Sequence, residues 1–460
     1  MSATERLAEF CAEADSRPTP TEASSPLERH LLDWAGLVVG AHEHAGSTPS
    51  VLGALGAMGS ETGPSTVLAT GERTAPDRAA LVNGTLAHSL DFDDTHRASS
   101  LHPGAPVISA AVAVAEAEGA STEGLLRAIV LGYDVTCALG RAVNPEAHYD
   151  RGFHITATCG TFGATAAVGH LLDLDTEGFV SAFGVNGSQA AGSLQFLDNG
   201  AWNKRLHPGL AASRAVLAGS LAASGFRGAT RAIEGRHGFF AGYTDDPDLA
   251  LLSGIEPGAA VRETAIKPYP CCRYIHGAID GLLEIGREVD AAGVESVEID
   301  LPRSGVALTG EPIEAKRSPE NFVDCQFSTP FAAALALSRG DAGLRAFLEA
   351  QSDLDAPALV RLMDRVEVET TDRTASRFPE TWAAGVVVET KGDRYERFVE
   401  HASGEPENAL SRERVEAKFR ELVTTAGVEE EAVEEVIAAC RSIGETEADA
   451  LFSALSGLGG

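Results

Sequence analysis

The sequence contains very little lysine, with five residues in 460: Lys204, Lys267, Lys316, Lys391 and Lys418. Arginine supplies the rest of the 36 basic residues, which face 67 acidic ones and leave a formal net charge of -31. Nucleic acid and anionic membranes are therefore not expected as partners. This composition is typical of an acidic, halophilic-type surface whose self-repulsion a salty cytoplasm would screen; a merely acidic mesophilic protein is the alternative.

The sequence also lacks the patterns of secreted, membrane and thiolate-metal proteins. Its seven cysteines are an odd number and include no Cys-x-x-Cys pair, which argues against a disulfide framework and a thiolate metal site. It has no apolar run of about 18 residues, and its acidic N-terminal segment lacks the apolar core of a signal peptide. We therefore expect a cytoplasmic protein with reduced thiols.

Two domains are the first expectation for a chain of this length. Apolar residues recur at helical spacing through the first half, and many are alanine or glycine, which permit close helix packing. Residues 295–301 and 365–371 alternate like strands, and 385–399 resemble a hairpin with its turn at residues 391–393. The pattern predicts a helical domain (1–265), an inserted α+β domain (266–403), and C-terminal helices (404–460) that rejoin the first domain.

The densest polar segment is residues 88–104, between two apolar helical stretches. Crowding of titratable groups between core helices is costly unless the groups are paired or used. One interpretation is a capped loop between helices; another is a metal-dependent hydrolase that uses these side chains as ligands. The segment contains His88, Asp91, Asp93, Asp94, Thr95, His96 and His102.

Three further segments place cations and imidazoles near predicted helix starts. His154 precedes a glycine-rich helix start, and Lys204 and His207 precede another helix, where an anion would offset the positive charge. Lys267 and Arg273 lie in a proline-rich link where the pattern changes from helical to α+β. The neighbouring cysteines, residues 271 and 272, are interpreted as packing thiols.

Together, these groups suit proton transfer beside a carboxylate. Lysine or histidine can stabilise the charge that builds on a carboxylate when an adjacent proton is removed, and an imidazole can act as base or acid. No P-loop, Rossmann fingerprint or Gly-x-Ser-x-Gly motif competes with this interpretation. A non-catalytic carboxylate-binding protein is a further alternative.

The ordered motifs resemble those of the MmgE/PrpD family, which includes 2-methylcitrate dehydratase, cis-aconitate decarboxylase and iminodisuccinate epimerase. The resemblance covers about residues 25–400 and is carried by NGTLAHSLDFDDTH, LHPG, RGFH, AWNKRLHPGLAA, EGRHGFF and IKPYPCCRYIHGAID. It implies a mainly α fold with a smaller α+β lid, an active site between the two domains, a homodimer and no required cofactor. The site positions it implies are Asp91, Thr95, His102, His154, Lys204 and Lys267.

Two departures from the family pattern bear on the reaction. Phe331 stands where cis-aconitate decarboxylases have a tyrosine, and Cys272 stands where that subgroup has a histidine. Both weaken a decarboxylase interpretation. The leading expectation is a hydro-lyase acting on a 2-methylcitrate-like di- or tricarboxylate, with a decarboxylase or epimerase of the same family as alternatives.

The expected roles follow from this chemistry. His102 and His154 are predicted as the acid/base groups, with Asp91 orienting one of them or serving as base. Thr95, Lys204, Lys267 and Arg273 are predicted to bind substrate, the two lysines from opposite domains. No metal ligand is assigned.

Overall fold

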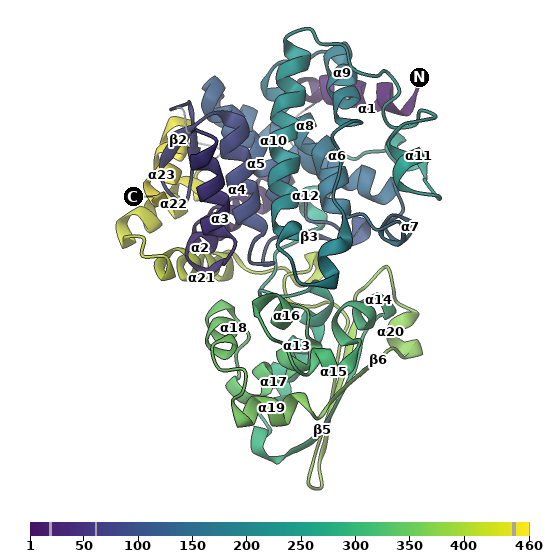
Figure 1. Ribbon diagram of the computed structural model, residues 1–460, viewed down its shortest axis with the longest axis vertical. Helices are drawn as coiled ribbons and strands as arrows, with labels where there is room; N and C mark the ends of the chain where they lie inside the picture. Colours follow the sequence, from purple (N-terminus) through teal and green to yellow (C-terminus); the bar gives the residue numbers. More distant parts are fainter. Residues whose placement is uncertain (18–20, 60–61, 444–447, 460) are drawn as a thin grey trace. The chain divides into compact units, whose positions relative to one another are not determined.

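The computed structural model describes residues 1–17, 21–59, 62–443 and 448–459. Two compact units make up the chain: Met1–Thr264 with Ser411–Gly460, and Ala265–Leu410. The first is a helical unit and the second is α+β, so the predicted fold class is confirmed (Figure 1). Residues 444–447 and 460 of the predicted C-terminal segment lie outside the described residues.

Six long helices form the core of the helical unit. The apolar character of α5 on every side suits a helix enclosed by other helices. Among the described residues, no helix combines the length and apolar character needed to cross a bilayer. The six are α2 (Thr21–His44), α4 (Pro76–His88), α5 (Gly104–Glu118), α6 (Thr122–Ala142), α8 (Ile155–Leu171) and α10 (Asn203–Ala223).

Two glycines allow α4 and α10 to approach each other closely. A Cβ atom at Gly209 of α10 would lie 2.2 Å from the carbonyl oxygen of Leu81 in α4, and one at Gly84 would lie 2.9 Å from the Cα of Gly209. Only glycine permits this backbone contact. Because α4 ends at His88 and α10 begins at Asn203, the tight crossing helps to bring the end of one helix near the start of the other.

The C-terminal helices belong to the same helical unit. They are α21 (Arg412–Thr425), α22 (Glu430–Arg441) and α23 (Ala448–Ser456), drawn in yellow beside the purple α2 in Figure 1. Gly36 and Gly40 of α2 face Phe419 and Leu422 of α21, where a Cβ atom at Gly40 would lie 2.7 Å from the Leu422 side chain. This packing brings residues more than 370 positions apart into one core.

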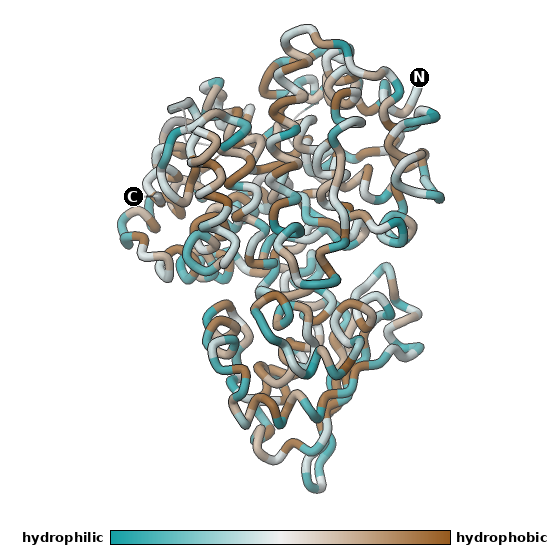
Figure 2. The backbone as a smooth tube through the Cα atoms, in the orientation of Figure 1, coloured by the Kyte–Doolittle hydropathy of each residue, from teal (hydrophilic) through white to brown (hydrophobic). Residues whose placement is uncertain are grey.

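The α+β unit contains a four-stranded sheet in the order β6-β5-β7-β8. β5 (Val294–Asp300) runs parallel to β6 (Val366–Glu369) and antiparallel to β7 (Ala384–Thr390), which pairs with β8 (Arg394–Val399). The predicted hairpin turn is confirmed, with Gly392 at φ 100° in a hydrophilic tip that is teal in Figure 2. The helices α13 (His276–Ile285) and α17 (Thr329–Arg339) supply apolar residues to the core of this unit.

Candidate active site

The segment that joins α4 to α5 is almost entirely buried despite its polar sequence. Asp91 adopts a left-handed backbone conformation with φ 50°, which aspartate tolerates better than most residues. His102 and Pro103 then lead into α5, and the backbone N–H of His102 donates to Thr156 Oγ1 of α8 at 3.1 Å. The polar groups are therefore enclosed by helices, where burial is costly for each group that finds no hydrogen-bond partner.

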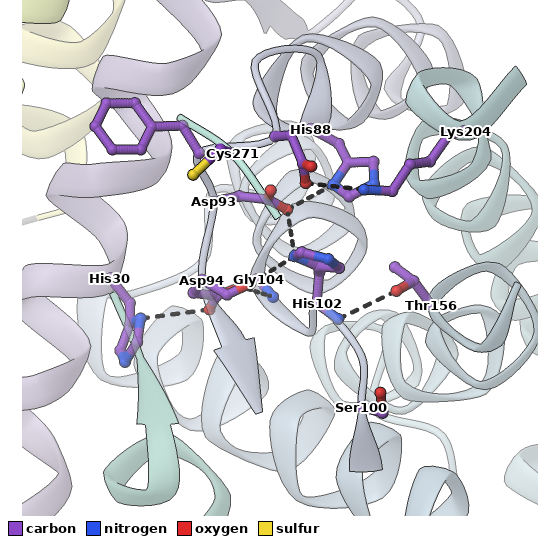
Figure 3. Close-up of polar contacts among 12 residues, drawn as sticks. His30, His88, Asp93, Asp94, Ser100, His102, Gly104, Thr156, Lys204 and Cys271 are labelled. Atoms are coloured by element: carbon purple, nitrogen blue, oxygen red, sulfur yellow. Dashed lines mark hydrogen bonds and ion pairs between the residues drawn. The ribbon is translucent and has the colours of Figure 1, made fainter. Parts of the chain in front are cut away.

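Asp93 lies between two imidazoles. Its Oδ2 atom is 2.7 Å from His88 Nδ1 and 3.4 Å from His102 Nδ1 (Figure 3). The same Nδ1 atom of His102 is 2.7 Å from the backbone carbonyl oxygen of Asp94. A carbonyl oxygen can only accept, so His102 Nδ1 carries a proton, and in the neutral form of this ring the lone pair lies on Nε2.

Burial and neighbouring charge determine the protonation of His88 and Asp93. Burial lowers the pKa of His88 to about 4, although Asp93 acts in the opposite direction. Burial would also raise the pKa of Asp93, but His102 and His88 outweigh it and hold that pKa well below its usual value. Asp93 is therefore ionised near neutral pH, and the neutral His88 ring donates to it from Nδ1.

A second imidazole pair lies beside the first. His154 precedes the first residue of α8, and its Nδ1 atom is 3.0 Å from Nδ1 of His207 in α10. The rings of His88 and His154 stack with centroids 5.8 Å apart. Burial lowers the pKa of His207 to about 4, and burial with the neighbouring His207, His88 and Lys204 holds that of His154 well below its usual value. Both rings are neutral near pH 7.

Lys204 supplies the positive charge at this site. It is the second residue of α10, and its Nζ atom donates to Asp91 Oδ1 at 2.8 Å. A cation at a helix N-terminus is disfavoured by the helix dipole, and the carboxylate of Asp91 offsets that cost. Thr95, four residues after Asp91, is also buried. Its Oγ1 atom has no hydrogen-bond partner.

A metal ion fits this cluster poorly. One ligand atom from each of His88, Asp93 and His102 lies within 4.8 Å of the others. However, His102 Nδ1 carries a proton that it donates to a carbonyl oxygen, so this atom has no lone pair for a metal in the observed arrangement. His96 contacts Ser99 and Glu263 instead, so the structure does not gather the full hydrolase ligand set around one centre.

The remaining predicted site residues belong to the α+β unit. Lys267 is 1% exposed. Arg273 is buried and donates to Glu405 at 2.7 Å, to the carbonyl oxygen of Ser403 at 3.2 Å, and lies 2.7 Å from His276 Nδ1. These contacts are those of an internal ion-pair network. Substrate binding by Lys267 and Arg273 stays a prediction.

Sequence reasoning gave no role to several residues that support the site. Lys418 of α21 donates to the carbonyl oxygen of Phe92 at 2.7 Å, inside the site segment. Tyr133 of α6 donates to Asp94 Oδ2 at 2.6 Å, and His30 of α2 lies 3.3 Å from the same oxygen. The scarcity of lysine was the one sequence signal that could have singled out Lys418.

Two family models match the chain. That of the MmgE/PrpD N-terminal domain covers residues 5–252, and that of the MmgE/PrpD C-terminal domain covers residues 269–442. Among curated proteins, a cis-aconitate decarboxylase of Aspergillus terreus is 24% identical over 65% of this chain, which spans 65% of that relative's length. The human cis-aconitate decarboxylase is 25% identical over 76% of this chain and 73% of its own length.

A third relative, the cis-aconitate decarboxylase-like protein oryM of Aspergillus oryzae, is 25% identical over 85% of this chain and 84% of its own length. Identities near 25% leave room for different substrates and reactions. These relatives therefore support the family of the chain and do not identify its substrate. The two domain models together span nearly the whole sequence, and the chain belongs to the MmgE/PrpD family.

Proposed function

We propose that this protein is a cofactor-independent lyase that removes a proton next to a carboxylate of a small di- or tricarboxylate. The leading reaction is dehydration of a 2-methylcitrate-like substrate. The observation that carries the proposal is the tautomer of His102, whose Nδ1 proton is donated to Asp94 and whose Nε2 lone pair remains available as a base. Membership of the MmgE/PrpD family supports the same class of chemistry.

The proposed step uses the charges and protons of these side chains. His102 Nε2 accepts the proton from the carbon next to a substrate carboxylate, and Lys204 stabilises the negative charge that builds on that carboxylate. The electron pair of the broken C–H bond forms a double bond as the hydroxyl group on the adjacent carbon leaves. The leaving hydroxyl takes a proton and departs as water, so atoms and charge balance.

His154 is proposed as the group that delivers this second proton. Burial and the neighbouring Lys204 keep it neutral in the free protein. A bound polycarboxylate would bring negative charge next to the ring and favour its protonated form. Asp91, which holds Lys204, would keep the ammonium group in place for the substrate carboxylate.

Decarboxylation is the second candidate, because the named relatives are cis-aconitate decarboxylases. The substitutions at Phe331 and Cys272 count against it. Phe331 is fully buried and packs edge-on against Phe347 with ring centroids 5.4 Å apart, so it behaves as an apolar core residue without a hydroxyl group. Epimerisation needs the same proton abstraction and differs only in the later return of a proton to the opposite face of the carbon.

A substrate panel tests the proposal. Purified protein is incubated with citrate, 2-methylcitrate, cis-aconitate, citramalate and iminodisuccinate, and products are followed by proton NMR. A new double bond without loss of carbon supports dehydration, whereas release of carbon dioxide supports decarboxylation. Failure of every polycarboxylate to react or to exchange a proton with solvent would contradict the proposal.

Metal dependence separates the proposal from a hydrolase. The homodimeric enzyme we propose should keep full turnover after exhaustive chelation, because the residues assigned to the reaction need no metal. Turnover that is lost on chelation and restored by one added divalent metal would favour the hydrolase instead. Metal analysis of the protein as purified gives an independent reading of the same question.

A further inference from the structure

Asp93 has no role in the proposed reaction, yet its carboxylate is among the most enclosed in the helical unit. The residue is 3% exposed and lies two positions after the left-handed turn at Asp91. Its two oxygens face different surroundings. Oδ2 contacts the Nδ1 atoms of His88 and His102, whereas Oδ1 is buried and has no hydrogen-bond partner in the protein.

The Asp93 side chain also borders a small internal cavity of about 10 Å³. That volume has room for one water molecule, which is enough to satisfy a buried carboxylate oxygen. Two of the side chains at this cavity, His30 and Asp94, contact each other at 3.3 Å (Figure 3). Asp33 also lines it, together with apolar residues of α2, α4 and α5.

The neighbouring carboxylate, Asp94, cannot replace Asp93. Its Oδ1 atom accepts the backbone N–H of Gly104 at 3.0 Å, and its Oδ2 atom accepts from Tyr133 at 2.6 Å. Only its backbone carbonyl oxygen reaches His102. The side chain of Asp94 therefore holds the start of α5, while that of Asp93 faces the imidazoles.

We propose that Asp93 is a positioning residue that fixes the Nδ1–H tautomer of His88 and steadies the imidazolium form of His102 during proton transfer. A carboxylate beside an imidazole orients the ring and favours its charged form, as the aspartate of a serine-protease triad does for the catalytic histidine. His88, held by Asp93, also stacks on His154, so one carboxylate orders both imidazole pairs. The part of this inference that concerns reaction rate rests on the proposed function.

Several other groups contribute to the electrostatics around these rings, so a pH experiment must change Asp93 alone. They come from several helices around the site segment and from the segment itself. They are His30 and Asp33 on α2, Tyr133 on α6, His154 before α8, Lys204 and His207 on α10, and Lys418 on α21, together with Asp91 and Asp94 in the segment itself.

The test compares Asp93→Asn with Asp94→Asn, which makes the same chemical change at the adjacent residue. Asp93→Asn should lower kcat by about 10²–10⁴-fold, since it removes the charge that supports proton transfer and disturbs the tautomer. The inflection of the kcat–pH profile that reports the base should move to lower pH, with KM changed little. Asp94→Asn should lower Tm through its weakened contacts to Tyr133 and Gly104, and should move the inflection much less than Asp93→Asn does, because the Asp94 side chain contacts neither ring.

Asp93→Glu serves as the conservative rescue, because it restores the charge and should return the inflection toward the wild-type pH. A purely structural role for Asp93 would instead lower Tm and leave the inflection of Asp93→Asn unmoved. That result would overturn the inference.

The tautomers can also be measured without turnover. In protein with ¹⁵N-labelled histidine, NMR should show His88 and His102 protonated at Nδ1 in the wild type. In Asp93→Asn, His88 should shift toward the Nε2–H form. If no substrate reacts, the proposed function fails while this measurement still decides the inference. Unchanged tautomers in Asp93→Asn would overturn it.

Discussion

Two lysine–aspartate pairs hold the site segment from different sides of the helical unit. Lys204 of α10 binds Asp91 at 2.8 Å, and Lys418 of α21 binds Asp33 at 2.7 Å. The chemistry and the distances are nearly the same, but the surroundings differ. The Lys204 side chain keeps 17% exposure, whereas that of Lys418 keeps 6%.

The partners of Lys418 explain why its side chain is less exposed than that of Lys204. Its ammonium group also donates to the carbonyl oxygen of Phe92 and lies 3.7 Å from the centroid of the Phe92 ring. It therefore ties the backbone of the site segment to α2 and α21. Lys204 begins a helix beside the imidazoles, where a substrate carboxylate could share its donors with Asp91. We therefore expect the Lys418–Asp33 pair to support the fold and the Lys204–Asp91 pair to take part in binding an anion.

Replacing Lys204 should have the largest effect on turnover. Lys204→Met removes a charge that we expect to stabilise the transition state, so kcat/KM should fall by about 10²–10³-fold. The variant also leaves Asp91 buried without its cation, so Tm should fall, but by less than on replacement of Lys418, because the Lys204 pair is the less enclosed of the two. Steady-state kinetics and thermal melting measure the two effects. Lys391→Met, at the exposed tip of the β7–β8 hairpin, is the matched control and should react at the wild-type rate.

Replacing Lys418 should instead have the largest effect on stability. Lys418→Met leaves Asp33 buried without its cation, which should cost about 3–5 kcal/mol of unfolding free energy. Denaturant unfolding measures this loss. The double variant Asp33→Asn/Lys418→Met, which removes both charges, should recover much of it. Equal stability of the single variant and the wild type would show that the pair does not support the fold.

The cost of Lys418→Met should depend on pH. Burial raises the pKa of Asp33 to about 6, even with Lys418 opposing it, and loss of the lysine should raise that pKa further. A carboxyl group whose pKa is higher in the folded than in the unfolded state stabilises the fold at low pH, and this contribution is lost as pH rises. The variant should therefore be closer to wild type at pH 5 than at pH 8. If Lys418→Met lost more unfolding free energy relative to wild type at pH 5 than at pH 8, the raised pKa of Asp33 would be contradicted.

Salt should raise Tm by screening charges over the whole surface. This effect does not depend on either lysine–aspartate pair. With a net charge of -31, the folded protein repels itself in dilute buffer, and added KCl screens that repulsion. Tm should rise by several degrees between dilute buffer and molar KCl, while the buried Lys418–Asp33 pair is screened little. A Tm independent of KCl would refute the halophilic interpretation of the composition.

The sequence predicted the fold class and the family because both depend on local patterns. Helical periodicity, the alternation in 295–301 and the hairpin turn are visible within short windows, and the family motifs are contiguous. The left-handed conformation of Asp91 could not be predicted in this way, since aspartate is also common in ordinary turns. Its backbone is fixed by the helices on either side of the segment.

Long-range partners were equally hidden from the sequence. Lys418 lies more than 320 residues from Phe92, and Arg273 lies 132 residues from Glu405. Sequence reasoning grouped His88, Asp91, Asp93 and His102 by proximity along the chain. It could not assign Asp93 to two rings, because the side-chain rotamers and the path of the segment between α4 and α5 decide that contact. The roles of the site residues stay predictions.

Solvent deuterium incorporation tests the central claim most directly, because it detects proton abstraction whether or not the reaction goes on to product. The experiment compares wild type, His102→Gln and His154→Gln with each reactive polycarboxylate in D₂O. The account predicts exchange next to a carboxylate in the wild type and a fall of about 10²–10⁴-fold in His102→Gln, which lacks the base. His154→Gln should lose product formation more than exchange. Wild-type exchange rates in both variants would contradict the account.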